Sequence, residues 1–211
     1  DARLILRVGG SMGDVYGQRL LKRDLNGYIL NEEGVGLTME NKETYLGSIL
    51  PKMNMGWSLG FGYKGVNLGM TFTGRFGGIV ISETQSVLDA AGVSKVSADV
   101  RDAGGVQINQ GKVSAQTYYQ AIQGTAAYYT YSATNVRLGE LSLSYTLPKK
   151  WFDNKVGMTV GLVGKNLWMI YCKAPYDPES TSSVTSNFYQ GVDYFQQPSL
   201  RSLGFNVKLT F

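Results

Sequence analysis

The chain has 211 residues, a formal net charge of +4, 27 glycines and 14 tyrosines, but only 5 prolines, one cysteine and no histidine. Without histidine, the chain cannot build histidine-based catalytic triads or zinc sites, and Cys172 has no partner for an internal disulfide. The positive charges are scattered along the sequence, so they do not indicate a nucleic-acid interface. No run of about 18 apolar residues predicts a transmembrane helix.

The first part of the chain predicts one strand and one turn. In residues 2–16, the segment RLILRVGG alternates weakly between apolar and polar positions, which predicts a strand. In RDLNGYILNEEG, the pair Asn26-Gly27 is typical of a hairpin turn. The acids Asp24, Glu32 and Glu33 lack the spacing and the glycine of a calcium loop, so solvated acids around a turn are the better interpretation.

Two strands with one apolar face follow, at residues 53–63 and 65–82, and Lys64-Gly65 forms a tight turn between them. Glycine, serine, threonine and asparagine occupy the opposite face. The segment GFGYKG matches a dinucleotide-binding pattern, but that motif requires a helix after its last glycine, where a strand is predicted here. We expect these apolar residues to face lipid: Trp57, Leu59, Phe61, Tyr63, Val66, Leu68, Met70 and Phe72.

The long segment 83–130 contains one predicted helix and a group of aromatic residues. The sequence VSAQTYYQAI predicts a short helix capped by Ser114. Tyrosine side chains stack on sugars and other ligands, and binding residues concentrate on loops. The alternative is that these tyrosines pack the loops together. The candidate substrate or lid contacts are Tyr118, Tyr119, Tyr128 and Tyr129.

Three further strands are predicted at residues 131–147, 155–171 and 199–211. The alternation changes phase at Gly139-Glu140, which indicates a β-bulge. The last strand alternates without interruption to the end of the printed sequence. We expect its apolar residues to act in barrel closure and membrane insertion: Phe205, Val207, Leu209 and Phe211.

The lengths of the connections and the two-faced strands together favour a transmembrane barrel. Connections alternate between long and short, as in outer-membrane barrels with long external loops and short periplasmic turns. Apolar faces would meet lipid, polar faces would line the lumen, and aromatic residues would mark the membrane interfaces. About six strands cannot close a barrel, because such barrels need at least about eight. We therefore expect this chain to be the C-terminal part of a larger antiparallel barrel, within an all-β fold.

Two other interpretations compete with the transmembrane barrel. A secreted β-sandwich that binds glycans through its loop tyrosines would cover the apolar strand faces with a second sheet. An enzyme is poorly supported, because the adjacent acids in YDPE (Tyr176–Glu179) favour a turn, and Cys172 has no histidine to activate its thiol. The sequence predicts no catalytic, cofactor or metal site.

Four ordered blocks resemble the C-terminal barrel region of the SusC/RagA family of TonB-dependent outer-membrane transporters from Bacteroidetes. The first is YLGSILPKMNMGWSLGFGYKGVNLGMTFTGRFGG, and the second is ATNVRLGELSLSYTLPKKW. The third is VGKNLWMIYCKAPYDPE, and the fourth is GVDYFQQPSLRSLGFNVKLTF. One departure is Ala174-Pro175, where many members have a glycine.

The resemblance implies a barrel of about 22 strands around an N-terminal plug, energised by TonB across the periplasm. It implies a SusD-like surface lipoprotein as a lid, and oligosaccharides or peptides as cargo. It also implies a role in transport without a catalysed reaction. We further expect a polar residue at Phe211 to impair membrane insertion, whereas Lys208→Gln should matter little because Lys208 faces the lumen.

Overall fold

The computed structural model describes residues 2–33, 36–152, 156–180 and 191–210. By their contacts these residues form two compact units, each assembled from separate stretches of the chain. Unit 1 takes residues 1–50, 78–132 and 180–197, and unit 2 takes residues 51–77, 133–179 and 198–211. None of the described helices combines the length and apolarity needed to cross a membrane.

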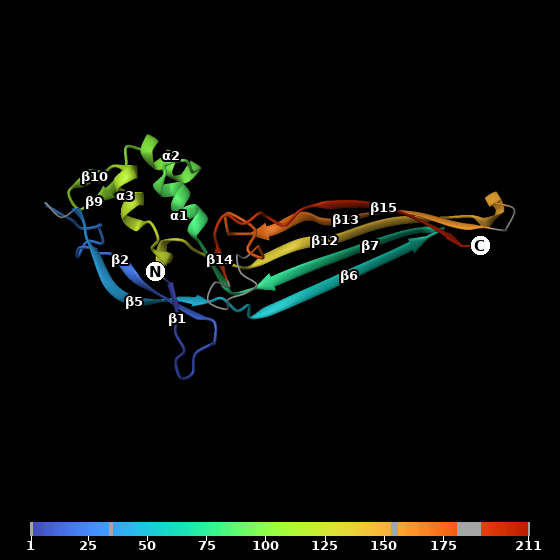
Figure 1. Cartoon of the computed structure of the whole chain (residues 1–211), viewed down its shortest axis with the longest axis horizontal. Coiled ribbons are helices and arrows are strands. Elements are labelled where there is room, and N and C mark those ends of the chain that lie inside the picture. Colours follow the sequence, from blue (N-terminus) through green and yellow to red (C-terminus); the bar gives the residue numbers. More distant parts are fainter. Residues whose placement is uncertain (1, 34–35, 153–155, 181–190, 211) are drawn as a thin grey trace. The chain divides into compact units, whose positions relative to one another are not determined.

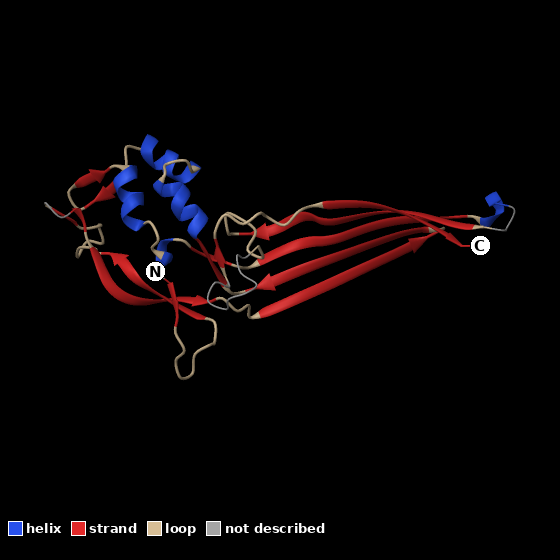
Figure 2. Ribbon diagram, in the orientation of Figure 1, coloured by secondary structure: helices blue, strands red, loops and turns tan. Residues whose placement is uncertain are grey.

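Unit 2 is built on one antiparallel sheet, whose long strands lie side by side in Figures 1 and 2. The strand order is β15-β13-β12-β7-β6. A short 3-10 turn, η2 (Lys149–Phe152), follows β12. The predictions of strands at 53–63, 155–171 and 199–211 are confirmed, although Phe211 lies outside the described residues. The strands are β6 (Met53–Tyr63), β7 (Val66–Phe76), β12 (Asn135–Leu147), β13 (Gly157–Cys172) and β15 (Ser202–Thr210).

The turn between β6 and β7 has the predicted two residues. Lys64 and Gly65 have φ angles of 45° and 87°, and Tyr63 pairs directly with Val66. Positive φ at both central positions is the geometry that matches the twist of the flanking strands. A strand, not a helix, follows GFGYKG, so its first two glycines are strand residues and the segment lacks the dinucleotide-binding context.

The predicted bulge in β12 is confirmed. The register shifts between Leu138 and Glu140 in the pairing of β12 with both of its neighbours. Because one extra residue is inserted, Leu138 returns to the face that holds Leu141. Leu138 pairs with Phe72 of β7, and Leu141 pairs with Met70 of the same strand.

Unit 1 combines four small sheets with three helices. One sheet has the order β1-β2-β5, and another has the order β11-β8-β14, in which β14 runs parallel to β8. Its strands are β1 (Ala2–Leu4), β2 (Asp14–Leu21), β3 (Asn31–Glu32), β4 (Gly36–Leu37), β5 (Met39–Ser48), β8 (Ile79–Ser82), β9 (Val106–Ile108), β10 (Gly111–Val113), β11 (Thr130–Ser132) and β14 (Val192–Asp193). Its helices are α1 (Glu83–Ala90), α2 (Lys95–Asp102), α3 (Ala115–Ile122) and the 3-10 turn η1 (Ala126–Tyr128).

Serine side chains begin all three α-helices. The hydroxyl of Ser82 accepts the amide of Gln85 at the start of α1, and Ser94 and Ser114 cap α2 and α3 in the same way. Such caps satisfy amides that have no partner within the helix. The helix predicted after Ser114 is confirmed, whereas α1 and α2 were not predicted. The described fold is therefore mostly antiparallel β-structure with a small helical part.

Two hydrophobic clusters form the core of unit 1. The smaller one comprises Val15, Ile49, Ile81 and Ala126. Residues of the strands β2 and β8 and of the 3-10 turn η1 contribute to it, so chain segments far apart in the sequence meet there. The larger cluster comprises Leu21, Ile29, Ile108, Ala115, Tyr119, Ile122 and Tyr129.

The predicted strand at residues 2–16 is wrong. The strand β1 ends at Leu4, the chain turns back through Gly9 (φ 82°), and β2 pairs antiparallel with β1. The carboxylate of Asp14 accepts the amide of Ser11 at 2.8 Å, which is turn chemistry that the weak alternation concealed. The long sheet therefore has five described strands, and this region contributes none of them.

Two other predicted strands are interrupted. Gly77 and Gly78 both have positive φ, so residues 65–82 divide into β7 and β8, which join different sheets. Residues 131–147 divide into β11 and β12, and at this break the hydroxyl of Thr134 accepts the amide of Gly77 at 3.0 Å. Glycine tolerates the left-handed conformation that the break between β7 and β8 requires.

The turn predicted at Asn26-Gly27 is confirmed. The carboxylate of Asp24 accepts the amides of Asn26 and Tyr28 at 2.9 Å each, and Gly27 has a φ of 84°. The Asp24 carboxylate thus satisfies backbone donors of the turn. This agrees with the prediction of a turn rather than a calcium loop.

Candidate functional site

One face of the sheet in unit 2 is apolar across all five strands. Strand pairing aligns its residues into rows that run perpendicular to the strands, because directly paired residues point to the same face. One row is Phe61, Leu68, Leu143, Leu162 and Phe205. The next rows are Tyr63, Val66, Tyr145, Val160 and Val207, and then Leu59, Met70, Leu141, Gly164 and Leu203.

This apolar face is exposed. Trp57 retains 62% of its accessible surface and Phe205 retains 71%. Soluble monomers rarely expose a contiguous apolar patch of this kind. The β-sandwich alternative requires a second sheet over this face, and unit 2 contains a single sheet among its described residues. All eight predicted lipid-facing residues, together with Phe205, Val207 and Leu209, lie on this one face.

The opposite face is small and polar. Two cross-strand hydrogen bonds join hydroxyls on it: Ser58 to Thr71 and Thr146 to Thr159, each at 3.1 Å. Lys208 pairs with Thr159 and therefore lies on this face. Asn67 and Ser144 pair with each other here. The sheet thus separates apolar from polar side chains with the period of two that its sequence predicts.

Aromatic residues gather in two rows of the apolar face. Trp57 and Trp168 belong to one row with Phe72 and Leu138. Tyr63 and Tyr145 share another row, three rows away. The row of Trp168 and the row of Met158 on β13 are about ten residues apart, or ~33 Å at the usual rise per residue. At a tilt near 40° this height is ~25 Å, the height of an outer-membrane apolar band.

The sheet has two open edges. Among the described residues, β6 pairs only with β7, and β15 pairs only with β13. An unpaired strand edge in lipid leaves backbone groups without hydrogen bonds, which costs several kcal/mol for each group. The five strands do not form a closed barrel, so a membrane location requires further strands at both edges.

The four candidate tyrosines lie in the core of unit 1. Tyr119 and Tyr129 are buried, and Tyr118 and Tyr128 pack against the same cluster. The rings of Tyr118 and Tyr119 meet edge to face with centroids 5.2 Å apart, and the Tyr128 hydroxyl accepts the amide of Leu21 at 3.0 Å. These contacts are packing contacts, as the alternative interpretation expects. Substrate or lid contact by these residues stays a prediction.

Burial changes the acid–base properties of this tyrosine cluster. It raises the pKa of Tyr118, Tyr119, Tyr129 and Tyr131 above the ordinary value of 10.0. The negative charge of Asp89 adds to the effect at Tyr119, Tyr129 and Tyr131. The phenols therefore remain neutral at physiological pH, and a free hydroxyl among them acts as a hydrogen-bond donor.

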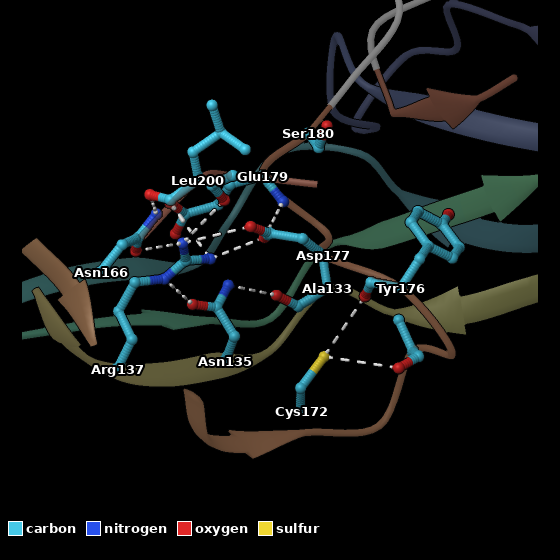
Figure 3. Close-up of polar contacts among 12 residues, drawn as sticks. Ala133, Asn135, Arg137, Asn166, Cys172, Tyr176, Asp177, Glu179, Ser180 and Leu200 are labelled. Atoms are coloured by element: carbon cyan, nitrogen blue, oxygen red, sulfur yellow. Dashed lines mark hydrogen bonds and ion pairs between the residues drawn. The ribbon is translucent and has the colours of Figure 1, made fainter. Parts of the chain in front are cut away.

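A buried ion pair lies near the start of β12 in unit 2, and Figure 3 shows the polar contacts around it. Arg137 of β12 donates to Asp177 at 2.8 Å, and their side chains are 7% and 9% exposed. The same guanidinium lies 3.3 Å from the carboxylate of Glu179 and 3.3 Å from the amide oxygens of both Asn135 and Asn166. A guanidinium offers five donors in a fixed geometry, so several acceptors can share it.

This cluster joins three separate stretches of unit 2. Arg137 comes from β12, Asp177 from the segment after β13, and Ser199, whose hydroxyl lies 3.5 Å from the guanidinium, from the segment before β15. The YDPE segment forms the predicted turn, in which the Asp177 carboxylate accepts the amide of Glu179 at 3.0 Å, and its acids are also ion-pair partners of Arg137. Arg137 is not among the residues that the sequence predicted, although an arginine on an otherwise two-faced strand is a signal that indicates such a site.

No family model matches this chain. Over 171 residues the chain is 26% identical to TonB-dependent receptor P3 of Formosa agariphila, a match that covers 77% of the chain and 17% of that receptor. The chain therefore spans only 17% of the length of the curated relative it matches.

Solved structures share the fold. The RagAB peptide importer in its open-open state matches with a TM-score of 0.61 and 20% identity, over 94% of this chain and 21% of that chain. A structure of the RagAB peptide transporter matches with a TM-score of 0.66 and 19% identity, over 100% of this chain and 24% of that chain. The resemblance to SusC/RagA-type TonB-dependent transporters that the four sequence blocks indicated is confirmed.

Proposed function

We propose that this chain, which resembles part of a SusC/RagA-type TonB-dependent transporter, forms C-terminal barrel strands of an outer-membrane nutrient importer. The exposed apolar face of unit 2 is the observation that carries the proposal. Lipid tails cover such a face without a second protein layer, and the polar face then lines a wet lumen. Further strands of a longer protein pair with the open edges of β6 and β15 and close the barrel.

The two units divide the work of the importer. Unit 2 supplies barrel wall, and unit 1, with its own core and its helices, supplies part of the extracellular mouth. Binding residues concentrate on loops that a rigid scaffold positions, which suits this division. No bond of the cargo is made or broken, and the chain acts as a transporter rather than an enzyme.

The partners follow from the family resemblance. TonB energises the importer through an N-terminal plug, and a SusD-like surface lipoprotein covers the extracellular side as a lid. The cargo is an oligosaccharide or a peptide. The similarity to RagAB, a peptide importer, supports the second class.

Fractionation and uptake by the full-length protein that contains this segment test the proposal. We expect the protein in the outer membrane, soluble only in detergent, and folded material should migrate differently on gels with and without heating. Uptake of labelled peptides or oligosaccharides should require TonB and the lipoprotein. A detergent-free, monomeric particle whose apolar sheet face is protected from hydrophobic labelling reagents would refute the proposal.

A further inference from the structure

A pocket of about 420 Å³ lies among the three helices of unit 1. Ligand sites for small molecules occupy clefts of this size and combine apolar walls with a few polar groups. The apolar part of its wall includes Ala90, Ala91 and Ala115. Its polar lining includes Asp89, Ser97, Arg101, Gln116 and Tyr119.

The start of α3 lines this pocket with Ser114, Ala115 and Gln116. The first amides of a helix have no partner within the helix. The Ser114 hydroxyl accepts the amide of Thr117 at 3.2 Å, and the Ser114 carbonyl accepts the amide of Tyr118 at 3.1 Å. The amides of Ala115 and Gln116 have no hydrogen bond within the described part of the chain. Such amides, with the positive end of the helix dipole, favour an anionic group.

The Tyr119 side chain is a second and independent sign of a ligand. It is only 6% exposed and lines the pocket, and its hydroxyl has no hydrogen-bond partner among the described residues. A hydroxyl without a protein partner, on a side chain that is otherwise buried, is available to a ligand in the pocket. The hydroxyl of Tyr129, by contrast, is enclosed completely. A pocket ligand with an acceptor oxygen would satisfy the Tyr119 hydroxyl.

The pocket carries charges of both signs. The Arg101 side chain is largely exposed, and its contact with Asp102 spans 3.7 Å, so its guanidinium remains accessible to a ligand. The buried carboxylate of Asp89 accepts Gln85 at 2.7 Å and the hydroxyl of Ser94, both on the same oxygen. Its other oxygen has no hydrogen bond within the described residues. A simple anion would be repelled by Asp89, whereas a ligand with both charges would not.

We propose that this pocket binds a zwitterionic ligand of the amino-acid or short-peptide class. The ligand carboxylate accepts the amides of Ala115 and Gln116 and the Tyr119 hydroxyl, close to the positive charge of Arg101. The ligand ammonium donates to the free oxygen of Asp89. The inference rests on the proposed import function for its physiological role, and it names peptides rather than oligosaccharides as the class that the helical part of unit 1 recognises.

Calorimetry on the detergent-purified full-length protein, with the dipeptide leucyl-alanine, tests the pocket. Its C-amidated and N-acetylated forms each lack one charge and should bind at least about 10-fold more weakly. A disaccharide that contains a uronic acid offers only the carboxylate and should also bind weakly. Equal binding of the uronic-acid disaccharide or of the N-acetylated dipeptide would overturn the zwitterion assignment.

Variants identify the site. Tyr119→Phe removes only the hydroxyl, Arg101→Met removes the charged guanidinium, and each should weaken dipeptide binding about 10-fold. Lys95→Gln is the matched control, because Lys95 pairs with Asp99 on α2 outside the pocket and should leave binding unchanged. Unchanged binding in both pocket variants would overturn the inference, with Tyr119→Phe the decisive one because it conserves the ring that packs the core.

The same proteins separate this inference from the proposed function. If dipeptide does not bind but cells still import nutrients through the protein, the pocket assignment fails and the importer stands. If dipeptide binds with the expected variant pattern but no import occurs, the pocket assignment stands and the importer fails.

Discussion

The two units of this chain use the same kinds of side chain in opposite ways. In unit 1, Ile81 and Tyr129 are almost completely enclosed by protein. In unit 2, Trp57 and Phe205 lie on a sheet face that no described residue covers. Unit 1 thus encloses its apolar side chains in a core of its own, whereas unit 2 leaves many of them on an exposed sheet face. The difference shows that alternation of apolar and polar residues defines an apolar strand face, but the alternation does not show whether protein covers that face.

The largest expected effect concerns the buried ion pair that stabilises the end of unit 2. Arg137→Met leaves the buried Asp177 without its partner, and we expect a loss of about 3–5 kcal/mol in local stability. Hydrogen exchange of residues 173–179 and 198–201 in the full-length protein measures this loss. Arg201→Met, at an exposed arginine beside the same cluster, is the control and should have little effect. Unchanged hydrogen exchange in Arg137→Met would show that the stability of unit 2 does not depend on the ion pair between Arg137 and Asp177.

The second prediction tests which face of unit 2 meets lipid. Leu143→Arg places a charge in the middle of the apolar face, and we expect a cost of about 2–4 kcal/mol and reduced levels in the outer membrane. Ser144→Arg is the matched control on the neighbouring position of the same strand, which faces the polar side. Blotting of outer-membrane fractions of the full-length protein compares the two. Equal outer-membrane levels of the two variants would contradict the assignment of the apolar face to lipid.

The third prediction concerns pH and affects unit 1. Burial raises the pKa of Tyr118, Tyr119, Tyr129 and Tyr131, so the folded state binds their protons more tightly than the unfolded state does. Their contribution to stability is complete below a pH of about 10, the value for an unperturbed tyrosine, and is lost progressively at higher pH. Limited proteolysis within residues 83–130 at rising pH follows this loss. Proteolysis that starts well below that pH would contradict the assignment.

The smallest effect compares two neighbouring hydroxyls in the core of unit 1. The Tyr129 hydroxyl is enclosed without a hydrogen-bond partner in the described structure, so Tyr129→Phe should stabilise unit 1 by about 1 kcal/mol. The Tyr128 hydroxyl accepts the amide of Leu21, so Tyr128→Phe should destabilise unit 1 by about the same amount. Hydrogen exchange in β2 and α3 measures both. Stability changes of the same sign in the two variants would contradict the prediction that only the Tyr128 hydroxyl contributes a hydrogen bond.

Elements with a strong local pattern were predictable from the sequence. Strands β6 and β7 alternate over their whole length, and the turn at Lys64-Gly65 needs only two residues with positive φ. The bulge near Gly139 was visible as a change of phase, and Ser114 marked a helix start. Each of these features depends on residues close together in the sequence.

Other features were not predictable, because they depend on partners far away in the chain. The prediction of one strand at residues 2–16 was wrong, because the alternation there is weak and the pairing of β1 with β2 decides where the chain turns. The ion pair of the YDPE acids was not predictable, because Arg137 lies 40 residues before Asp177 and only the fold brings them together. The place of the tyrosines in a core was not predictable either, because a sequence does not show which side chains a core encloses.

The sequence by itself determined that period-two strands divide apolar from polar side chains in unit 2, because a strand points successive side chains to opposite faces whatever its neighbours are. Only the tertiary structure decided which strands share the sheet, that the tyrosines of unit 1 lie in a core, and that Arg137 is saturated by carboxylates and amides from three segments. These outcomes depend on long-range contacts, whose free energy is gained only after distant parts of the chain have come together.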